Sequence, residues 1–268
     1  MIALNKTTAT EKIIIQISDT HLMDHPDATF VEMNPEMSFH AVIEDILKHY
    51  PEIDAIVHTG DLAQVAKPET YARYQAFMQK LNIPFYQIPG NHDDIQYFPF
   101  ETPDPMPTVL AFADWRMVLL NSAVSQKVDG WIKTEQLEHL KNILDANQQY
   151  SVVLACHHHP LEMKSNWIDR HKLKNTEELT EVLAKHNNIK AVIFGHVHQD
   201  SLNLWKNIQF LSTPSTSVQF KPLSFDFALD DIAPGYRSIL LKDNGEFDTL
   251  VHRVQKYRQK FNKEISGY

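Results

Sequence analysis

The chain has 268 residues, of which 43% are hydrophobic and 22% are charged, which is ordinary for a soluble globular protein with a sizeable core. A formal net charge of −9 with neutral histidines argues against the broad basic surface that extended nucleic acid requires. The single cysteine, Cys156, excludes an intramolecular disulfide and fits a reducing compartment. Residues 1–12 are polar and no apolar run has the length of a membrane span, so we expect a cytoplasmic protein without a signal peptide or membrane contact.

The first third of the chain alternates between strand and helix patterns. An apolar strand is predicted over Lys12 to Ser18, and a helix with apolar residues at helical spacing up to Tyr50 follows the capping pair Asn34-Pro35. Further strands are predicted over 55–57 and 85–88, with a helix over 69–81 between them. This alternation is typical of βαβ units in a parallel sheet, and therefore of an α/β protein.

The remainder begins with an irregular loop, because four prolines lie between Tyr97 and Pro107. Strands are then predicted over 109–112, 116–121, 151–156 and 191–194, and helices over 136–144 and 176–186. After residue 200 we expect antiparallel strands over 202–205, 208–211, 224–229, 238–241 and 247–254. Without repeats or a linker, we predict one domain over 1–268, with a core at about 12–254 and a polar C-terminal tail at 255–268.

Five of the predicted strands end in side chains that bind metals. These residues are Asp19 and His21, Asp61, Asn91 with His92, His157, and His196 with His198. Gly60, Gly90 and Gly195 precede three of these groups, where we expect the backbone to turn sharply. Asp-x-His and His-x-His would present both side chains on one side of an extended segment. Each group alone has an ordinary explanation, such as a helix cap, but five together indicate a site at the carboxyl edge of a sheet.

The ligand chemistry narrows the choice of metal. Carboxylates, imidazoles and an amide without a thiolate pair favour iron, manganese or zinc. Seven candidate ligands are too many for one tetrahedral ion and suit two divalent ions that share Asp61. Two metals about 4 Å apart are a recurring device for in-line displacement at phosphorus. His92 would then stand beside the leaving oxygen as a proton donor.

These motifs, in this order, resemble the five blocks of the calcineurin-like metallophosphoesterases over residues 12–254. The resemblance implies a four-layer sandwich of two facing mixed sheets flanked by helices, with a dinuclear site at the carboxyl edge. It further implies that Asp19, His21, Asp61 and His198 hold one metal, and that Asp61, Asn91, His157 and His196 hold the other. Relatives commonly read His-His-Pro-Pro where this chain has His157-His158-His159-Pro160, so His158 remains an alternative to His157.

A narrower resemblance, to the bacterial class III cyclic-nucleotide phosphodiesterases, extends to segments 166–169, 174–175, 213–222 and 233–237. It implies that a hydroxide bridging the metals opens 3′,5′-cyclic AMP to 5′-AMP and that His92 protonates the 3′ oxygen. His21, Asp61, Asn91, His92, His157 and His198 would contact this substrate. Segments 213–222 and 233–237 would supply hydroxyl donors and an aromatic or arginine face for the purine, or form ordinary turns and strand edges.

Two other functions fit the same motifs. The chain could act on another phosphodiester or a phosphomonoester with the same metals, which a comparison of rates on both classes would reveal. It could also be a non-catalytic scaffold of the same architecture. Scaffolds of this kind lack the histidine after the asparagine, whereas His92 is present here. The sequence does not determine the native metals, the selectivity among cyclic nucleotides or the oligomeric state.

Overall fold

The computed structural model describes residues 3–257, 262, 265 and 267. Its first sheet has the strand order β13-β12-β1-β2-β3. The three N-terminal strands run parallel and are β1 (Lys12–Ile17), β2 (Ala55–His58) and β3 (Phe85–Gln87). The hairpin of β12 (Gly235–Leu241) and β13 (Phe247–Arg253) continues this sheet, because β12 pairs antiparallel with β1. The predicted parallel unit and the antiparallel C-terminal hairpin therefore belong to the same sheet.

The second sheet has the order β4-β5-β6-β7-β9-β8. Its parallel centre consists of β5 (Trp115–Leu119), β6 (Ser151–Cys156), β7 (Ile189–Phe194) and β9 (Ile208–Ser212). The edges are antiparallel and are formed by β4 (Thr108–Phe112) and β8 (Ser201–Trp205). A separate short pair joins β10 (Gln219–Phe220) and β11 (Leu229–Asp230). Both large sheets are thus mixed, as the fold prediction requires.

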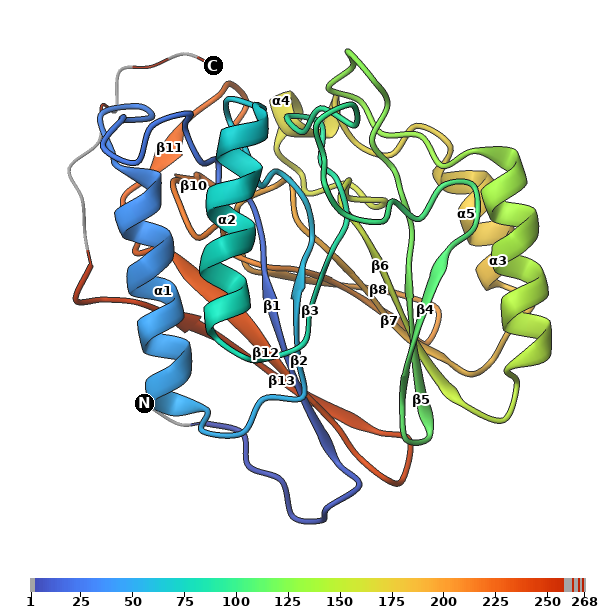
Figure 1. The fold of residues 1–268 in the computed structure, drawn as a ribbon. Coiled ribbons are helices and arrows are strands. Elements are labelled where there is room, and N and C mark those ends of the chain that lie inside the picture. Colours follow the sequence, from blue (N-terminus) through green and yellow to red (C-terminus); the bar gives the residue numbers. More distant parts are fainter. Residues whose placement is uncertain (1–2, 258–261, 263–264, 266, 268) are drawn as a thin grey trace.

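Helices cover the outer face of each sheet, which completes the four predicted layers (Figure 1). Outside the first sheet lie α1 (Pro35–His49) and α2 (Pro68–Lys80), and outside the second lie α3 (Thr134–Ala146) and α5 (Thr176–Leu183). One apolar cluster fills the space between the sheets and two others lie between a sheet and its helices. The short helix α4 (Asn166–Asp169) lies at the end of the molecule toward which β1 and β2 run (Figure 1).

Local chemistry explains where α1 begins and which face it buries. The Asn34 side chain accepts a hydrogen bond from the Met37 backbone N–H at 2.8 Å, and Pro35 occupies the first turn. Phe39, Val42, Ile43 and Ile46 are buried at helical spacing. Leu47 falls within the same apolar pattern but is 43% exposed. A position one residue after Ile46 has rotated off the buried stripe.

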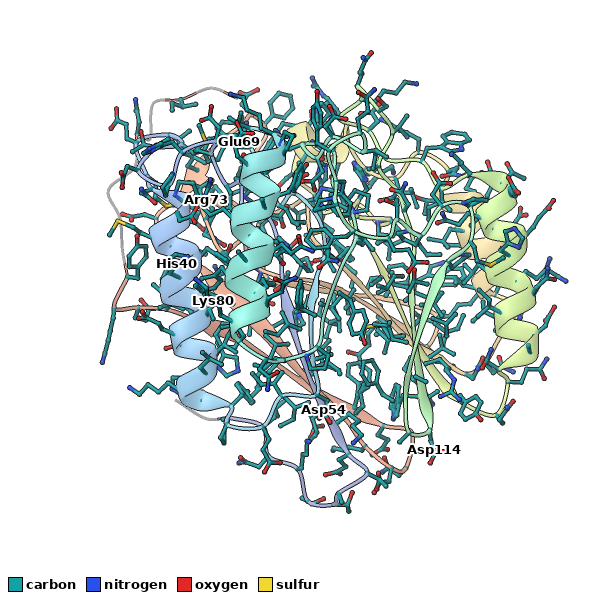
Figure 2. The ribbon with its side chains drawn as sticks, in the orientation of Figure 1. His40, Asp54, Glu69, Arg73, Lys80 and Asp114 are labelled. Atoms are coloured by element: carbon teal, nitrogen blue, oxygen red, sulfur yellow. The ribbon has the colours of Figure 1, made fainter. Side chains whose placement is uncertain are left out.

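The amino end of the sheets is held by ordinary ion pairs. Asp54, just before β2, accepts from the Ile13 backbone N–H at 2.8 Å and pairs with Lys6 at 2.7 Å and Lys12 at 3.3 Å. Figure 2 shows Asp54 and Asp114 at this end of the molecule, opposite Glu69 at the start of α2. The metal-binding candidates lie at the other end, where the parallel strands terminate.

Two element predictions are wrong. Residues 224–228, predicted as part of a strand, form a bend and irregular backbone, and only Leu229 and Asp230 pair with β10. The helix predicted to end at His186 ends at Leu183, where Ala184 takes the capping position. Part of the predicted tail at 255–268 lies outside the described residues. Among the described residues, no helix combines the length and apolarity needed to cross a lipid bilayer.

Candidate metal centre

Five predicted ligands lie in the left-handed backbone region, where non-glycine residues are uncommon. The φ angles are 54° for Asp19, 52° for His21, 54° for Asp61, 68° for His196 and 48° for His198. Our interpretation of Asp-x-His and His-x-His as extended segments is therefore wrong. The side chains converge because each strand ends in a tightly turned loop. Such backbone strain is concentrated at functional sites, where the surrounding structure holds it in place.

The glycines before these ligands serve two different needs. Gly60 has φ of 99°, which is the turning role we predicted. Gly90 and Gly195 do not have positive φ; they allow the loops to approach each other closely. A Cβ on Gly90 would lie 2.1 Å from Asp61 Oδ1, and one on Gly195 would lie 2.0 Å from Ser18 Oγ. Alanine at either position would push apart loops that carry candidate metal ligands.

The first group of ligands joins the loops after β1 and β7. His21 Nδ1 donates to Gln64 Oε1 at 2.7 Å, and His198 Nδ1 donates to the Val218 carbonyl at 2.8 Å. The Nε2 atoms of both rings consequently face each other at 3.1 Å, and His198 Nε2 lies 3.4 Å from Asp19 Oδ1. Burial lowers the pKa of His21 to about 3, so its ring is neutral. Two imidazole lone pairs directed at each other beside a carboxylate form an arrangement that could hold a cation.

Asp61 connects this group to a second one. Its Oδ2 lies 3.8 Å from His21 Nε2 and 3.3 Å from His157 Nε2, while its Oδ1 accepts the His92 backbone N–H at 2.9 Å. Asn91 Oδ1 is 3.1 Å from His157 Nε2. One carboxylate oxygen therefore faces ligands of both groups, which is the arrangement a shared ligand needs.

The geometry separates His157 from His158. His157 Nδ1 donates to the Thr59 carbonyl at 2.7 Å, which leaves Nε2 directed at Asp61 and Asn91. In His158 both nitrogens are engaged, Nδ1 with Ser122 Oγ at 2.8 Å and Nε2 with the Val128 carbonyl at 3.0 Å. Ser122 Oγ also accepts the backbone N–H groups of both histidines. This bonding favours His157 as the ligand.

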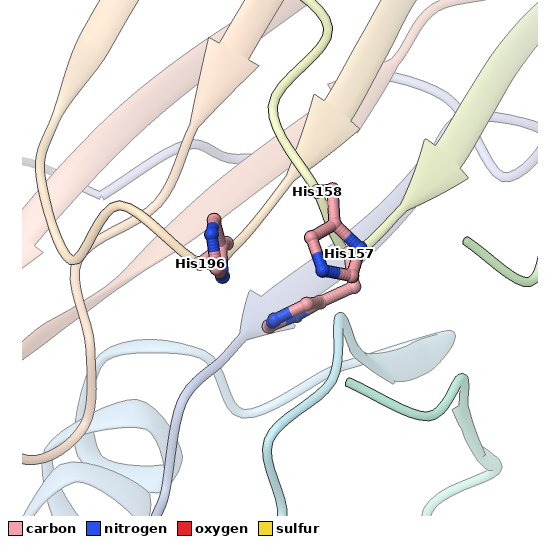
Figure 3. Close-up of side chains that lie close together, drawn as sticks. All are labelled: His157, His158 and His196. Atoms are coloured by element: carbon pink, nitrogen blue, oxygen red, sulfur yellow. The ribbon is translucent and has the colours of Figure 1, made fainter. Parts of the chain in front are cut away.

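His196 completes the second group from the opposite side. Figure 3 shows His157 and His158 leaving the loop after β6, with His196 facing them from the loop after β7. The rings of His157 and His196 are 5.0 Å apart, and His196 Nε2 is buried with no hydrogen-bond partner among the described residues. The His196 backbone N–H donates to Asp19 at 3.0 Å, which ties the two groups together. A buried imidazole nitrogen without a protein donor or acceptor fits a metal ligand.

The ionisation of the candidate ligands at this edge of the sheets is also compatible with bound cations. Burial acts to raise the pKa of Asp19 and Asp61, but the neighbouring imidazoles, chiefly His198 and His157 respectively, hold both below the usual range. Burial acts to lower the pKa of His157, and Asp61 overrides it and raises the value to about 9. The His157 proton thus occupies a position that a cation would take over. Donor atoms 3.1–3.8 Å apart match neighbouring ligands about 2.1 Å from a common ion.

His92 and Asp93 follow Asn91 but serve different purposes. His92 packs edge-on against His21, with ring centroids 5.0 Å apart, and lines the cavity in front of the ligands. Asp93 faces away and accepts hydrogen bonds from the backbone N–H groups of Gly90 (2.9 Å), Leu62 (3.2 Å) and Ala63 (3.1 Å), and from the Tyr71 hydroxyl (3.0 Å). These hydrogen bonds of Asp93 hold the Asp61 loop against the Asn91 loop.

A cavity of about 610 Å³ opens onto the metal edge, a volume that suits a small organic ligand. Besides His21, Asp61, Asn91, His92, His196 and His198, it is lined by Val128, Trp167, Ile168, Arg170, His171, Phe220, Asp226, Phe227 and Gly267. The sequence singled out Trp167, Ile168 and Phe220 as part of longer segments, but not Asp226 or Phe227. Both lie within segment 224–229, which was predicted as a strand, so no pattern pointed to them as cavity residues.

Most of the predicted hydroxyl wall lies elsewhere. Ser215 Oγ donates to the Asp19 carbonyl at 2.7 Å and Thr216 Oγ1 to Thr20 Oγ1 at 3.2 Å, and both residues are buried. Arg237 is also buried and donates to the Ser212 carbonyl and to Asp200. These groups support the ligand loops and the sheet, because their hydrogen bonds go to backbone carbonyls and side chains outside the cavity lining. These contacts agree with the structural interpretation of much of segments 213–222 and 233–237, whereas Phe220 of the first segment lines the cavity.

The fold and the paired ligand groups define a metallophosphoesterase. Residues 13–200 match the calcineurin-like phosphoesterase family, and the chain belongs to it. The chain is 37% identical to the 3′,5′-cyclic adenosine monophosphate phosphodiesterase CpdA of Haemophilus influenzae, over 95% of this chain and 94% of that protein. CpdA of Escherichia coli K12 is likewise 37% identical, with the same coverage. The structure is similar to a dimetal phosphatase from Danio rerio with a TM-score of 0.60, at 15% identity over 91% of this chain and 99% of that one.

Proposed function

We propose that this protein hydrolyses the 3′,5′-cyclic phosphodiester of cyclic AMP to 5′-AMP and so lowers intracellular cyclic AMP. The observation that carries the proposal is its likeness, over nearly the whole chain, to CpdA phosphodiesterases. The metal edge and its cavity supply the chemistry and the space that such a reaction needs. We place the protein in the cytoplasm, because its single cysteine is buried and unpaired, as expected in a reducing compartment.

We assign Asp19, His21, Asp61 and His198 to one cation, and Asp61, Asn91, His157 and His196 to the other. The distances and hydrogen bonds described above support this division, as does the position of Asp61 Oδ2 between both groups. Bound cations would activate water and neutralise charge on the phosphoryl oxygens. Iron or manganese is the pair we favour, because imidazole, carboxylate and amide ligands without thiolate suit these ions.

His92 is the residue we assign to proton transfer. Its backbone N–H is anchored on Asp61, and its ring borders the cavity beside the ligands. From this position the imidazole would give a proton to the departing 3′ oxygen. Asn91 would contact the cation directly. Substituting His92 should therefore affect proton transfer, whereas substituting Asn91 should affect metal binding.

The test uses the full chain, stripped with a chelator and reloaded with Mn²⁺ or Fe²⁺. We expect turnover of cyclic AMP, little turnover of a phosphomonoester, and two metal ions per chain by elemental analysis. His92→Ala should keep both ions and lose most turnover, by about 10²-fold or more. Asn91→Ala should lose one ion and activity together. Hydrolysis of an aryl phosphodiester without hydrolysis of cyclic AMP would refute the substrate, and equal metal loss in both variants would refute the role of His92.

A further inference from the structure

Three aromatic side chains form one surface of the cavity beside the metal edge, and we call Trp167, Phe220 and Phe227 the aromatic wall. Their ring centroids are 4.8 Å apart for Trp167 and Phe220, 5.0 Å for Trp167 and Phe227, and 5.5 Å for Phe220 and Phe227. Phe220 is buried, whereas Trp167 and Phe227 are only half-buried and line the cavity. The wall therefore presents apolar ring surface to whatever occupies the space in front of the metals.

The wall is fixed to the metal ligands. The Phe220 ring stacks on the His198 ring with centroids 3.9 Å apart and planes 7° from parallel, and its backbone N–H donates to the His198 carbonyl. Trp167 Nε1 donates to Ser224 Oγ at 3.1 Å, and the Asn166 backbone N–H donates to the Ser224 carbonyl at 3.1 Å. These bonds join α4 to the loop that carries Phe227. A rigid platform of this kind costs a ligand little ordering entropy.

Polar groups stand at the border of the wall. Asp226 lines the same cavity and precedes Phe227 in the chain. Arg170 and His171, from the end of α4, line it as well, and His171 Nδ1 is bonded to Asp129 at 2.9 Å. A carboxylate beside an apolar, planar surface is suited to accept a hydrogen bond from an amino group on a flat heterocycle. A phosphate ester without a ring would use neither feature.

We infer that the aromatic wall is the nucleobase subsite, with a purine packed against Trp167 and Phe227 and its exocyclic amino group donating to Asp226. This inference rests on the proposed function, because the metal edge must hold the phosphate of the same molecule. It assigns substrate selection to α4 and to residues 226–227, outside the metal-binding motifs. Selection and chemistry are then carried by different loops.

Binding of the product tests the subsite without requiring turnover. The Mn²⁺-loaded full chain is titrated by calorimetry with 5′-AMP, with ribose 5-phosphate, which lacks the base, and with purine riboside 5′-monophosphate, which lacks the amino group. The variants are Phe227→Leu, which removes the ring, and Asp226→Ala, which removes the acceptor. The matched control is Phe225→Leu, because Phe225 is two residues away, 69% exposed and absent from the cavity lining. Thermal unfolding of each variant confirms folding. Phe227→Tyr is the conservative variant that keeps the ring, and the comparison of 5′-AMP with ribose 5-phosphate on the wild type decides the question if Phe227→Leu is unstable.

We expect 5′-AMP to bind about tenfold or more tightly than ribose 5-phosphate, since stacking on an aromatic side chain is substantial for any base. Phe227→Leu should weaken the binding of 5′-AMP by about tenfold and leave the binding of ribose 5-phosphate unchanged. Phe227→Tyr, which keeps the ring, should bind both ligands as the wild type does. Asp226→Ala, which removes the acceptor, should abolish an about fivefold preference for 5′-AMP over purine riboside 5′-monophosphate. Equal binding of 5′-AMP and ribose 5-phosphate, or equal weakening by Phe227→Leu and Phe225→Leu, would overturn the subsite. Base-dependent binding without turnover of cyclic AMP would refute the proposed function and leave the subsite standing.

Discussion

Replacing Asp93 by asparagine tests how the two loops that carry Asp61 and Asn91 are held together. Four donors surround the Asp93 carboxylate. Oδ2 accepts from the backbone of Gly90 and Leu62, and Oδ1 accepts from the backbone of Ala63 and from the Tyr71 hydroxyl. An amide keeps one accepting oxygen and turns an NH₂ group toward two of these donors. Asp93→Asn therefore keeps nearly the same shape, but two of the four donor groups then face the NH₂ group of the asparagine and have no acceptor.

The expected loss follows from these bonds. Each enclosed donor left without an acceptor costs about 1–3 kcal/mol, so two should lower the free energy of unfolding by about 4 kcal/mol. Tyr71→Phe is the matched control, because it removes one donor to Asp93 and the acceptor of the Asp94 backbone N–H, and should cost about 1.5 kcal/mol. Weakened support behind metal ligands typically reduces metal affinity by about 10–100-fold. We expect this reduction in metal affinity in Asp93→Asn and not in Tyr71→Phe.

The assay is urea unfolding of the metal-free protein at pH 8, followed by Mn²⁺ titration of each variant. This pH is chosen because burial and the nearby charge of Asp61, opposed by the backbone donors, raise the pKa of Asp93 to about 7. Above that value the wild-type carboxylate is ionised and accepts all four bonds. If Asp93→Asn unfolds at the same urea concentration as Tyr71→Phe and binds Mn²⁺ as tightly as the wild type, Asp93 does not hold the loops.

Three other results are expected. His157→Ala should lose one cation while His158→Ala keeps both, because both nitrogens of His158 are already hydrogen-bonded. Elemental analysis of the two variants measures the metal content, and the reverse pattern would make His158 the ligand. Burial lowers the pKa of His252 from 6.5 to about 4, so the stability that it contributes, at most about 3 kcal/mol, is complete above pH 6.5 and is lost as the pH falls toward 4. In His252→Gln, the free energy of unfolding measured with urea should therefore depend less on pH between 6.5 and 4. The same pH dependence in this variant and the wild type would contradict the role of His252. Chelation should lower the melting temperature and Mn²⁺ should restore it, since ions at a hundredfold excess over Kd stabilise the folded state by about 3 kcal/mol; an unaltered melting temperature would argue against bound cations.

The sequence predicted the layers and strands well where one physical signal dominated. Continuous apolar runs before Asp19, Asp61 and His157 identified buried parallel strands, and Asn34-Pro35 identified the start of α1. The segment 224–229 misled us because alternating aromatic and polar residues resemble a half-buried strand. There the alternation serves a cavity wall, with Phe227 turned inward and Phe225 outward in an irregular loop.

The site was predictable in composition but not in shape. Residue types and strand ends named the candidate ligands, because hard ligands at five strand ends are unusual. Left-handed backbone at Asp19 and His21 leaves no mark in the sequence, since aspartate and histidine adopt many conformations. The same is true of the bonding that separates His157 from His158, which depends on Ser122 and Val128 from a distant loop. Only the folded chain brings those partners together.

The antiparallel pairing of β1 with β12 has a consequence for biosynthesis. Asp19 leaves the ribosome early, but the strand beside β1 and the Ser215 hydroxyl that bonds the Asp19 carbonyl are made near the end of the chain. At about 5–20 residues per second, roughly 10 to 40 seconds separate the two events. The nascent polypeptide therefore carries its liganding side chains long before they are assembled, and we expect the cations to be acquired only after translation is complete.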